Sequence, residues 1–391
     1  ILASNPIALE ALDDRLRQDL VRKGNPHRRY LSLLPEGKAF LIVEFGADTK
    51  TEAERMARHL TARLRTSLRP PSIKVIVNEG EERHLWSLRE AGLGTTAFVP
   101  GQPDTLPGWE DSAVPPDKLG GYLRDLSALF DRYGYRPAIY GHFGMGCVHC
   151  RIDFDLTTPK GIAKWKAFKD EATSLVVSYG GSLSGEHGDG QARAAFLGKM
   201  FGAELLQAFR EWKGIWDPLG KMNSGRIVDP NPIDANLRLG PGYAPAEPVT
   251  HFKYPDDHGS FARATLRCVG IGKCRRLDGS PGDHVMCPSF MVLREEKHTT
   301  RGRAHLLWEM LQRQTPIDGG FRDENVKEAL DLCLSCKGCK GECPVNVDIA
   351  TYKAEFLSHY WEGRRRPLHA YVFGHIDRVA RLASAAPGFF N

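Results

Sequence analysis

The sequence contains no apolar run long enough to cross a membrane, because its longest runs, such as residues 40–43, have the length of one strand. It also has little excess charge: 53 basic and 48 acidic residues leave a formal net charge of +5, which argues against a nucleic-acid partner. Residues 1–5 lack the basic, apolar and cleavage regions of a signal peptide, and the chain begins at Ile1 without Met. We therefore expect a piece of a longer cytoplasmic protein with two or three domains.

Cysteine is scarce outside one segment, since seven of the nine cysteines lie between Cys268 and Cys343. Such a gathering, with prolines after some of the cysteines, indicates a metal site in a reducing compartment and not a disulfide scaffold. Cys333, Cys336, Cys339 and Cys343 have the spacing of bacterial ferredoxins, the last one preceding a proline. Soft thiolates are the ligands that iron–sulfur clusters need. The run therefore predicts at least one 4Fe-4S cluster, with a zinc knuckle as the alternative.

The other three cysteines of this segment leave the number of clusters open. Cys268 and Cys274 match the first and third positions of the same template, Ile271 stands in the middle position, and Cys287 precedes a proline. Seven thiolates are one short of what two four-iron clusters need, which fits a three-iron cluster or a four-iron cluster with an open iron. With crossed ligands, one cluster would take Cys333, Cys336, Cys339 and Cys287, and the other Cys268, Cys274 and Cys343. The alternative is a single cluster bound by Cys333, Cys336, Cys339 and Cys343.

Two glycine-punctuated segments carry a second group of reactive side chains. His142 and His149 lie in the first segment, and Glu186 and His187 lie in the second. Two histidines and one carboxylate from separate loops could hold a divalent ion (Zn, Mn or Fe) with open positions, and His187 is then the nearest base. Glycines such as Gly188 allow a ligand to approach the backbone closely. The alternative is that these histidines are structural.

Hydrophobic periodicity predicts a mixed α and β domain over residues 1–230, which we class as α+β with helices packed on a sheet. A strand, a helix opened by a capping box of Thr51 and Glu54, and a second strand follow one another, which predicts a β-α-β order. Beyond residue 261 no strand is expected. The expected strands are 39–45, 73–77, 138–140 and 148–154, and the expected helices are 51–64, 115–134, 162–180 and 196–212.

Five segments of the chain closely resemble the C-terminal half of FAD-linked oxidases, the vanillyl-alcohol-oxidase-type flavoproteins whose members oxidise D-lactate, glycolate or D-2-hydroxyglutarate. The segments are 88–92, 109–115, 142–149, 181–190 and 222–227. Residues 267–357 resemble the ferredoxin-type domain that is fused behind the flavin domain in large bacterial members. Together the likeness covers nearly the whole chain.

The resemblance implies an architecture and a cofactor set. It implies an antiparallel-sheet cap domain over 1–230, a linker over 231–260, a mainly α-helical 4Fe-4S ferredoxin-type domain over 261–362 and a helical tail over 363–391. FAD is the implied flavin. The family's FAD pyrophosphate-binding domain is not recognisable before residue 51, nor a cysteine-rich domain after residue 391, so we expect a fragment that does not hold FAD firmly alone.

The resemblance also implies roles for individual residues. By position, His187 resembles the active-site base and Arg89 the arginine that grips the substrate carboxylate with a bidentate fork. The implied metal ligands are His142, His149 and Glu186, and the residues implied near the flavin are Asn223, Glu186 and Gly188. Three residues depart from the family pattern: Met145 where Asp is common, Trp109 where some relatives have a substrate lysine, and Ser224 where proline is usual.

The expected function is therefore flavin-dependent oxidation of a D-2-hydroxy acid, with D-lactate favoured over glycolate or 2-hydroxyglutarate. Electrons would leave through the clusters to a quinone or cytochrome-type acceptor. Two rivals are an iron–sulfur electron-transfer subunit without its own substrate site and a metal-dependent hydrolase. The basic run 364–366 could contact the inner face of a membrane, or be a solvated turn.

Overall fold

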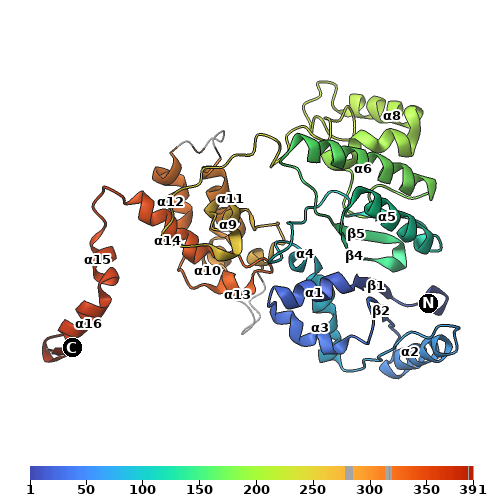
Figure 1. Ribbon diagram of the computed structural model, residues 1–391, viewed down its shortest axis with the longest axis horizontal. Helices are drawn as coiled ribbons and strands as arrows, with labels where there is room; N and C mark the ends of the chain where they lie inside the picture. The colour runs from blue at the N-terminus through green and yellow to red at the C-terminus, as the bar shows by residue number, and fades with distance from the viewer. Residues whose placement is uncertain (278–284, 313–316, 318, 386, 391) are drawn as a thin grey trace. The chain divides into compact units, whose positions relative to one another are not determined.

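The computed structural model describes residues 1–277, 285–312, 317, 319–385 and 387–390. The chain divides into two compact units, residues 1–243 and residues 244–391 (Figure 1). The first unit combines a sheet with helices, and the described residues of the second contain helices but no strand. The α+β class and the absence of strands beyond residue 261, both predicted from the sequence, are confirmed in the described residues.

The sheet of the first unit has five strands in the order β2-β1-β4-β5-β3, and every neighbouring pair is antiparallel. This confirms the antiparallel sheet. The strands are β1 Ala8–Asp13, β2 Ala39–Glu44, β3 Ser112–Ala113, β4 Ala138–Gly141 and β5 Cys147–Arg151.

Helices of the first unit begin and end where local chemistry favours it. Thr158 caps α6 by accepting the N–H of Gly161, and α5 ends at Gly134 in the left-handed region, which glycine adopts without strain. The helices are α1 Asp14–Arg22, α2 Lys50–Arg65, α3 Glu79–Glu90, α4 Gly92–Thr95, α5 Leu119–Tyr133, α6 Pro159–Ser178, α7 Gly190–Arg193 and α8 Leu197–Trp216.

The main core of this unit lies where α5 and α6 pack beside β5. Phe130 of α5 and Phe168 of α6 stack with ring centroids 5.3 Å apart, and both are buried. Cys150 of β5 is fully buried in the same cluster. Its neighbours on the strand, His149 and Arg151, point to the opposite face of the sheet but are buried as well. The strand that carries His149 is therefore enclosed on both faces, which fixes its position.

The predicted β-α-β order is wrong. Residues 73–77 form no strand, and most of their side chains are exposed, so their β-branched character does not reflect pairing. The partner of β2 is instead β1, which runs antiparallel to it with Ala8 opposite Glu44. Because β1 also pairs with β4, it joins the two halves of the sheet. The sequence pattern missed β1 altogether.

Two boundaries also differ from those expected. The side chain of Thr49, not Thr51, caps α2 by accepting the N–H of Glu52. The strand expected over 148–154 ends at Arg151, after which only Ile152 makes an isolated bridge, with Leu106. The other predicted helices and strands of this unit match observed ones within a few residues.

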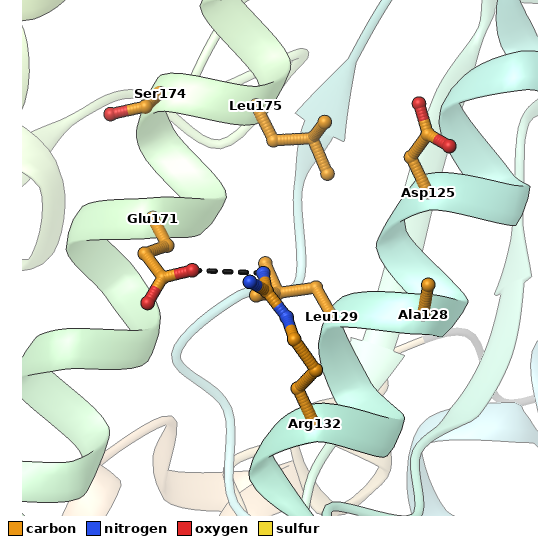
Figure 2. A pocket seen from close by; sticks show the side chains of 7 residues that line it. All are labelled: Asp125, Ala128, Leu129, Arg132, Glu171, Ser174 and Leu175. Atoms are coloured by element: carbon orange, nitrogen blue, oxygen red, sulfur yellow. Dashed lines mark hydrogen bonds and ion pairs between the residues drawn. The ribbon is translucent and has the colours of Figure 1, made fainter.

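A surface pocket lies between α5 and α6 (Figure 2). Arg132 and Glu171 face each other across it, with Nη2 of the arginine 2.8 Å from Oε2 of the glutamate. Both side chains are about half exposed or more, so this ion pair contributes little to stability. None of the predicted site residues lines this pocket.

The second unit is built around α11 and α14, and a buried glutamate attaches its first residues. Glu355 of α14 is fully buried, and its carboxylate accepts the backbone N–H groups of His251 and Phe252 at 2.9–3.1 Å.

No helix in the described residues is both long and apolar enough to span a bilayer. The helices are α9 Phe261–Leu266, α10 Pro288–Leu293, α11 Thr300–Met310, α12 Glu324–Asp331, α13 Gly338–Glu342, α14 Ile349–Tyr360, α15 Leu368–Gly374, α16 Ile376–Ala385 and α17 Pro387–Phe390.

Gly146, in the turn between β4 and β5, provides the first prediction. Its φ is +72°, and a Cβ there would lie 1.8 Å from the carbonyl oxygen of Val114. We expect Gly146→Ala to lower the free energy of unfolding by about 3 kcal/mol. Alanine is strained at this positive φ, and the backbone must also move to remove the clash with Val114. Gly134→Ala is the matched control: its φ is +62° and nothing lies within 4 Å, so only the strain of about 1 kcal/mol remains. Urea unfolding measures both, and equal losses would contradict the account.

Candidate functional site

The four predicted reactive residues come from two connections of the first unit. His142 follows β4 directly, and His149 lies within β5, so the β4–β5 hairpin holds both imidazoles. Glu186 and His187 lie in the turn between α6 and α7. The turn is attached to the sheet by Ala113 of β3, which exchanges two backbone hydrogen bonds with Ser182.

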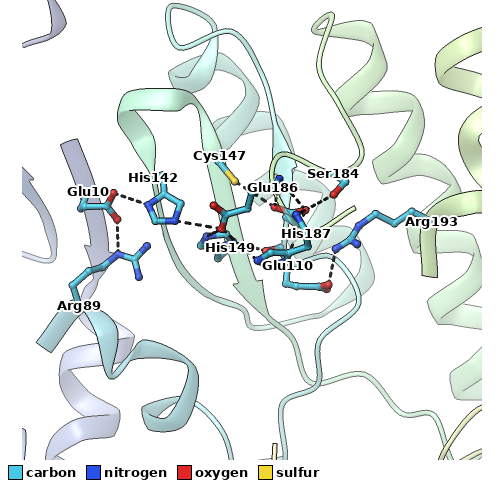
Figure 3. A network of polar contacts seen from close by, with 11 residues as sticks. Glu10, Arg89, Glu110, His142, Cys147, His149, Ser184, Glu186, His187 and Arg193 are labelled. Atoms are coloured by element: carbon cyan, nitrogen blue, oxygen red, sulfur yellow. Dashed lines mark hydrogen bonds and ion pairs between the residues drawn. The ribbon is translucent and has the colours of Figure 1, made fainter. Parts of the chain in front are cut away.

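The structure brings these four side chains together around a single carboxylate oxygen. Oε1 of Glu186 lies 3.3 Å from Nε2 of His142, 3.2 Å from Nε2 of His149 and 3.3 Å from Nε2 of His187 (Figure 3). The rings of His149 and His187 are parallel, with centroids 5.4 Å apart. Three imidazole nitrogens and a carboxylate thus converge from separate segments.

Partners on the far side of two imidazoles fix which nitrogen faces Glu186. Nδ1 of His142 lies 2.7 Å from a carboxylate oxygen of Glu10, and Nδ1 of His149 lies 2.5 Å from the backbone carbonyl of Glu110. Each Nδ1–H can donate to its oxygen, which leaves Nε2 with a free lone pair toward Glu186. Burial lowers the pKa of His149, although its hydrogen bond to Glu110 opposes this effect, which favours the neutral ring. Imidazoles whose Nε2 atoms are oriented in this way are suited to bind a metal ion.

Asp111 holds the turn that carries Glu186 and His187. Its fully buried carboxylate accepts the backbone N–H groups of Glu186 at 3.1 Å and His187 at 2.8 Å, and the hydroxyl of Ser184 at 2.5 Å. Burial alone would raise the pKa of Asp111, but the hydrogen bonds from Ser184 and the His187 N–H outweigh it and lower the pKa below its usual value. Nδ1 of His187 lies 3.8 Å from the same carboxylate.

Glu10 connects Arg89 to the imidazoles that surround Glu186. Its Nε lies 2.7 Å from the second oxygen of Glu10, whose first oxygen faces His142 (Figure 3). Arg89 is buried, and among the described residues its Nη2 has no hydrogen-bond partner. A buried guanidinium N–H without a partner is costly unless a ligand satisfies it. Arg89 therefore presents a donor suited to an anionic group.

Several residues of this network were not predicted from the sequence. Glu10 lies on the strand that the pattern missed, and Glu110 and Asp111 were noted only as part of a family segment. Nη2 of Arg193 lies 2.5 Å from Oε1 of Glu110, and its Nη1 donates to the Gly188 carbonyl at 2.9 Å. The pair of adjacent acidic residues, Glu110 and Asp111, was the feature of the sequence that could have indicated their part in the site.

The remaining residues of the first unit with predicted roles lie more openly. Gly188 has φ +81°, and a Cβ there would contact nothing, so its surroundings leave room for a ligand. Asn223 is exposed, with φ +46°, in a turn beyond α8. Trp109 is buried and donates its ring N–H to Tyr122, so it belongs to the core. Met145 is exposed.

The cysteines of the second unit fall into two groups. Cys268, Cys274 and Cys343 line one small cavity. Burial raises the pKa of Cys339 to about 11, with smaller contributions from Asp348 and from Cys333, which lies nearby. Cys336 is exposed between them in the sequence. Cys287 belongs to neither group, and its Sγ lies 2.9 Å from the backbone N of Thr300.

The donor set around Glu186 fits a divalent ion. Two oriented imidazoles and a carboxylate are the ligands that Zn, Mn and Fe accept in sites with open positions. Cys147 also lies within reach of this group. Burial raises the pKa of its thiol to about 12, with Asp111 contributing, so Cys147 stays protonated and is a poor ligand.

Comparison with known proteins identifies the families of both units. Residues 1–227 match the family model described as FAD linked oxidases, C-terminal domain, and residues 264–347 match the 4Fe-4S dicluster domain. The chain belongs to the FAD-linked oxidase family, as the sequence predicted. FAD and a 4Fe-4S cluster are its cofactors.

The curated relatives are considerably longer than this chain. A D-2-hydroxyglutarate dehydrogenase of Pseudomonas putida is 29% identical over all of this chain, which covers 42% of the relative, and one of Escherichia coli is 29% identical over 90% of this chain and 38% of its own length. A D-lactate dehydrogenase of Archaeoglobus fulgidus is 35% identical over 30% of this chain and 26% of its own length. The chain thus spans about two fifths of the length of the relatives that match most of it.

Asp111 provides the second prediction. Asp111→Asn replaces one acceptor oxygen with an amide NH₂, so we expect the free energy of unfolding at pH 7 to fall by about 2 kcal/mol. Because the folded pKa lies below the ordinary 3.8, this stabilisation is present above pH 3.8 and is lost as the pH falls through the folded value. Urea unfolding at several pH values should show the difference from wild type shrinking in acid.

The exposed Asp117 offers the matched control, since Asp117→Asn removes a charge close by in the sequence without touching the turn. It should leave stability almost unchanged at pH 7. A difference between wild type and Asp111→Asn that stays constant down to low pH would contradict the role given to the ionised carboxylate.

Proposed function

We propose that this chain supplies the substrate cap and the electron exit of a flavin-dependent D-2-hydroxy-acid dehydrogenase. The observation that carries the proposal is the convergence of three imidazole Nε2 atoms on Glu186, with Arg89 one carboxylate away. An electron-transfer subunit without a substrate site would not need this group of imidazoles around Glu186. A hydrolase would leave the iron–sulfur domain without a purpose.

Arg89 is proposed to bind the substrate carboxylate. Its unpartnered Nη2 is a buried donor, and its Nε is held by Glu10, so the guanidinium is oriented before any ligand arrives. An arginine fork suits a carboxylate better than a lysine would, because it offers two parallel donors. A 2-hydroxy acid carries such a carboxylate next to the reacting carbon.

His187 is proposed to take the proton of the substrate hydroxyl. It is about half exposed, so a ligand can reach its Nε2, and the Asp111 carboxylate stands 3.8 Å from its Nδ1. A carboxylate at that distance stabilises the imidazolium that forms when the ring accepts a proton. FAD, when bound, supplies the acceptor for the hydride from the substrate α-carbon.

His142, His149 and Glu186 are proposed to hold a divalent ion, which would act as a Lewis acid toward the hydroxyl oxygen. The acceptors on Nδ1 of both histidines support this assignment, since such outer partners typically orient metal-binding imidazoles. Asn223 and Gly188 are proposed to lie near the flavin.

D-2-hydroxyglutarate is the proposed substrate, because the relatives matched over nearly the whole chain carry that name. D-lactate, which the sequence favoured, and glycolate are the competing substrates, supported by relatives that match shorter parts. A quinone or cytochrome-type protein is the proposed acceptor. A cytoplasmic location, with contact to the inner face of a membrane through residues 364–366, completes the proposal.

The third prediction concerns the base. In a FAD-loaded protein that contains this chain, we expect His187→Gln to lower kcat with D-2-hydroxyglutarate roughly 100- to 10,000-fold, since the proton would lack an acceptor. Bound divalent metal, measured by mass spectrometry, should stay near the wild-type amount. The exposed His59 on α2 gives the control His59→Gln, with unchanged kcat. An unchanged kcat in His187→Gln would refute this role.

The fourth prediction separates substrate oxidation from electron exit. Cys336→Ser removes an exposed ligand of the second cysteine run. Substrate should still reduce the flavin at the wild-type rate in stopped-flow, because the cap is untouched. Delivery of electrons to a one-electron acceptor should fall at least about tenfold, since the cluster path is broken.

Ser335→Ala changes the neighbouring exposed residue without removing a thiolate, so both rates should stay at the wild-type values. Equal electron delivery by wild type and Cys336→Ser would show that the flavin passes its electrons elsewhere. Loss of flavin reduction in Cys336→Ser would instead contradict the separation of the two functions.

A further inference from the structure

The two cysteine runs of the second unit share one spacing but differ in one residue. The later run places thiols at Cys333, Cys336 and Cys339, three residues apart each time. The earlier run repeats this spacing with Cys268 and Cys274 at its ends and Ile271 in the middle. In ferredoxin-type domains all three positions bind the same cluster, and the fourth ligand comes from the other run.

The structure shows that the earlier run follows this geometry despite the isoleucine. Cys268, Ile271 and Cys274 all line one cavity, and the fourth residue expected from the crossed arrangement, Cys343, lines it too. Among the described residues, the cysteines that line this cavity are therefore Cys268, Cys274 and Cys343. Ile271 therefore stands at the site itself, where the template has a thiolate.

Cys287 is engaged differently. It is not among the residues that line this cavity. Its Sγ accepts the backbone N–H of Thr300, the first residue of α11, at 2.9 Å and also contacts the Thr300 hydroxyl at 2.9 Å. The N–H groups of Val285 and Met286, just before it, donate to Glu342 of α13, so this segment is attached to the helix that contains Cys339. Met286 and Thr300 also line the cavity of the earlier run, and Cys274 lies near enough to raise the pKa of Cys287, although burial raises it more. The assignment of Cys287 to the later run therefore follows the crossed template and the attachment to α13.

We propose that the cluster held by Cys268, Cys274 and Cys343 has three protein thiolates and three irons, with Ile271 filling the corner where a fourth iron would lie. An aliphatic side chain cannot ligate iron, and it also keeps water away from that corner. The inference rests on the cluster binding of the proposed function. It adds that the two clusters differ in composition, with about seven irons per chain instead of eight.

The test compares wild type with Ile271→Cys, both purified anaerobically with their clusters. An oxidised three-iron cluster has an odd number of unpaired electrons and gives an EPR signal, whereas an oxidised four-iron ferredoxin cluster is silent. We expect wild type to show that signal and about seven irons per chain. Ile271→Cys supplies the missing thiolate, so the signal should disappear and the iron count should rise to about eight. The control Ile271→Val keeps an aliphatic side chain and should behave as wild type.

Other outcomes overturn the inference. Wild type with about eight irons and no signal when oxidised would mean that another group ligates the fourth iron. A signal and an iron count unchanged in Ile271→Cys would place the missing thiolate in the other cluster. Should Ile271→Cys fail to fold, the wild-type spectrum and iron count decide alone. Protein without iron would refute the cluster binding itself, a failure distinct from that of the three-iron assignment.

Discussion

The first unit is organised around a single carboxylate, Glu186, which meets three imidazoles. Such an arrangement is stable only if each imidazole is held from behind, because a carboxylate alone does not select which ring nitrogen faces it. Glu10 and the backbone of Glu110 orient two of the rings, and Asp111 fixes the turn that carries the third together with Glu186. The positions of the reactive atoms depend on two buried carboxylates, those of Glu10 and Asp111, and on the backbone carbonyl of Glu110.

The strands of the first unit place both the imidazoles and the groups that orient them. The β4–β5 hairpin carries two of the imidazoles, His142 directly after β4 and His149 on β5, a strand that is buried on both faces and packs beside α5 and α6. Strand β1 runs along the other side of β4 and delivers Glu10, which also holds Arg89. The arginine proposed to bind the substrate carboxylate and a histidine proposed to hold a metal thus share one buried acid. A change in one is expected to affect the other.

Much of this could be read from the sequence, and the failures have physical causes. Glycine-punctuated loops and ferredoxin spacing are local signals, so His142, His149 and the cysteine run were recognisable without a structure. Strand β1 was not recognisable, because its pattern of burial depends on pairing with two strands distant in the chain. Glu10 was missed with it. Residues 73–77 show the converse, since their β-branched side chains have no strand to pair with.

The most direct test of the account is the position of a divalent ion. Crystals grown with Mn²⁺ and measured at the manganese absorption edge should give one anomalous peak in the first unit, bounded by Nε2 of His142, Nε2 of His149 and the carboxylate of Glu186. Such a peak would establish the cluster as a metal site beside the Arg89 donor. Crystals without a peak at this position, although the three imidazoles still surround the Glu186 carboxylate, would contradict the central claim.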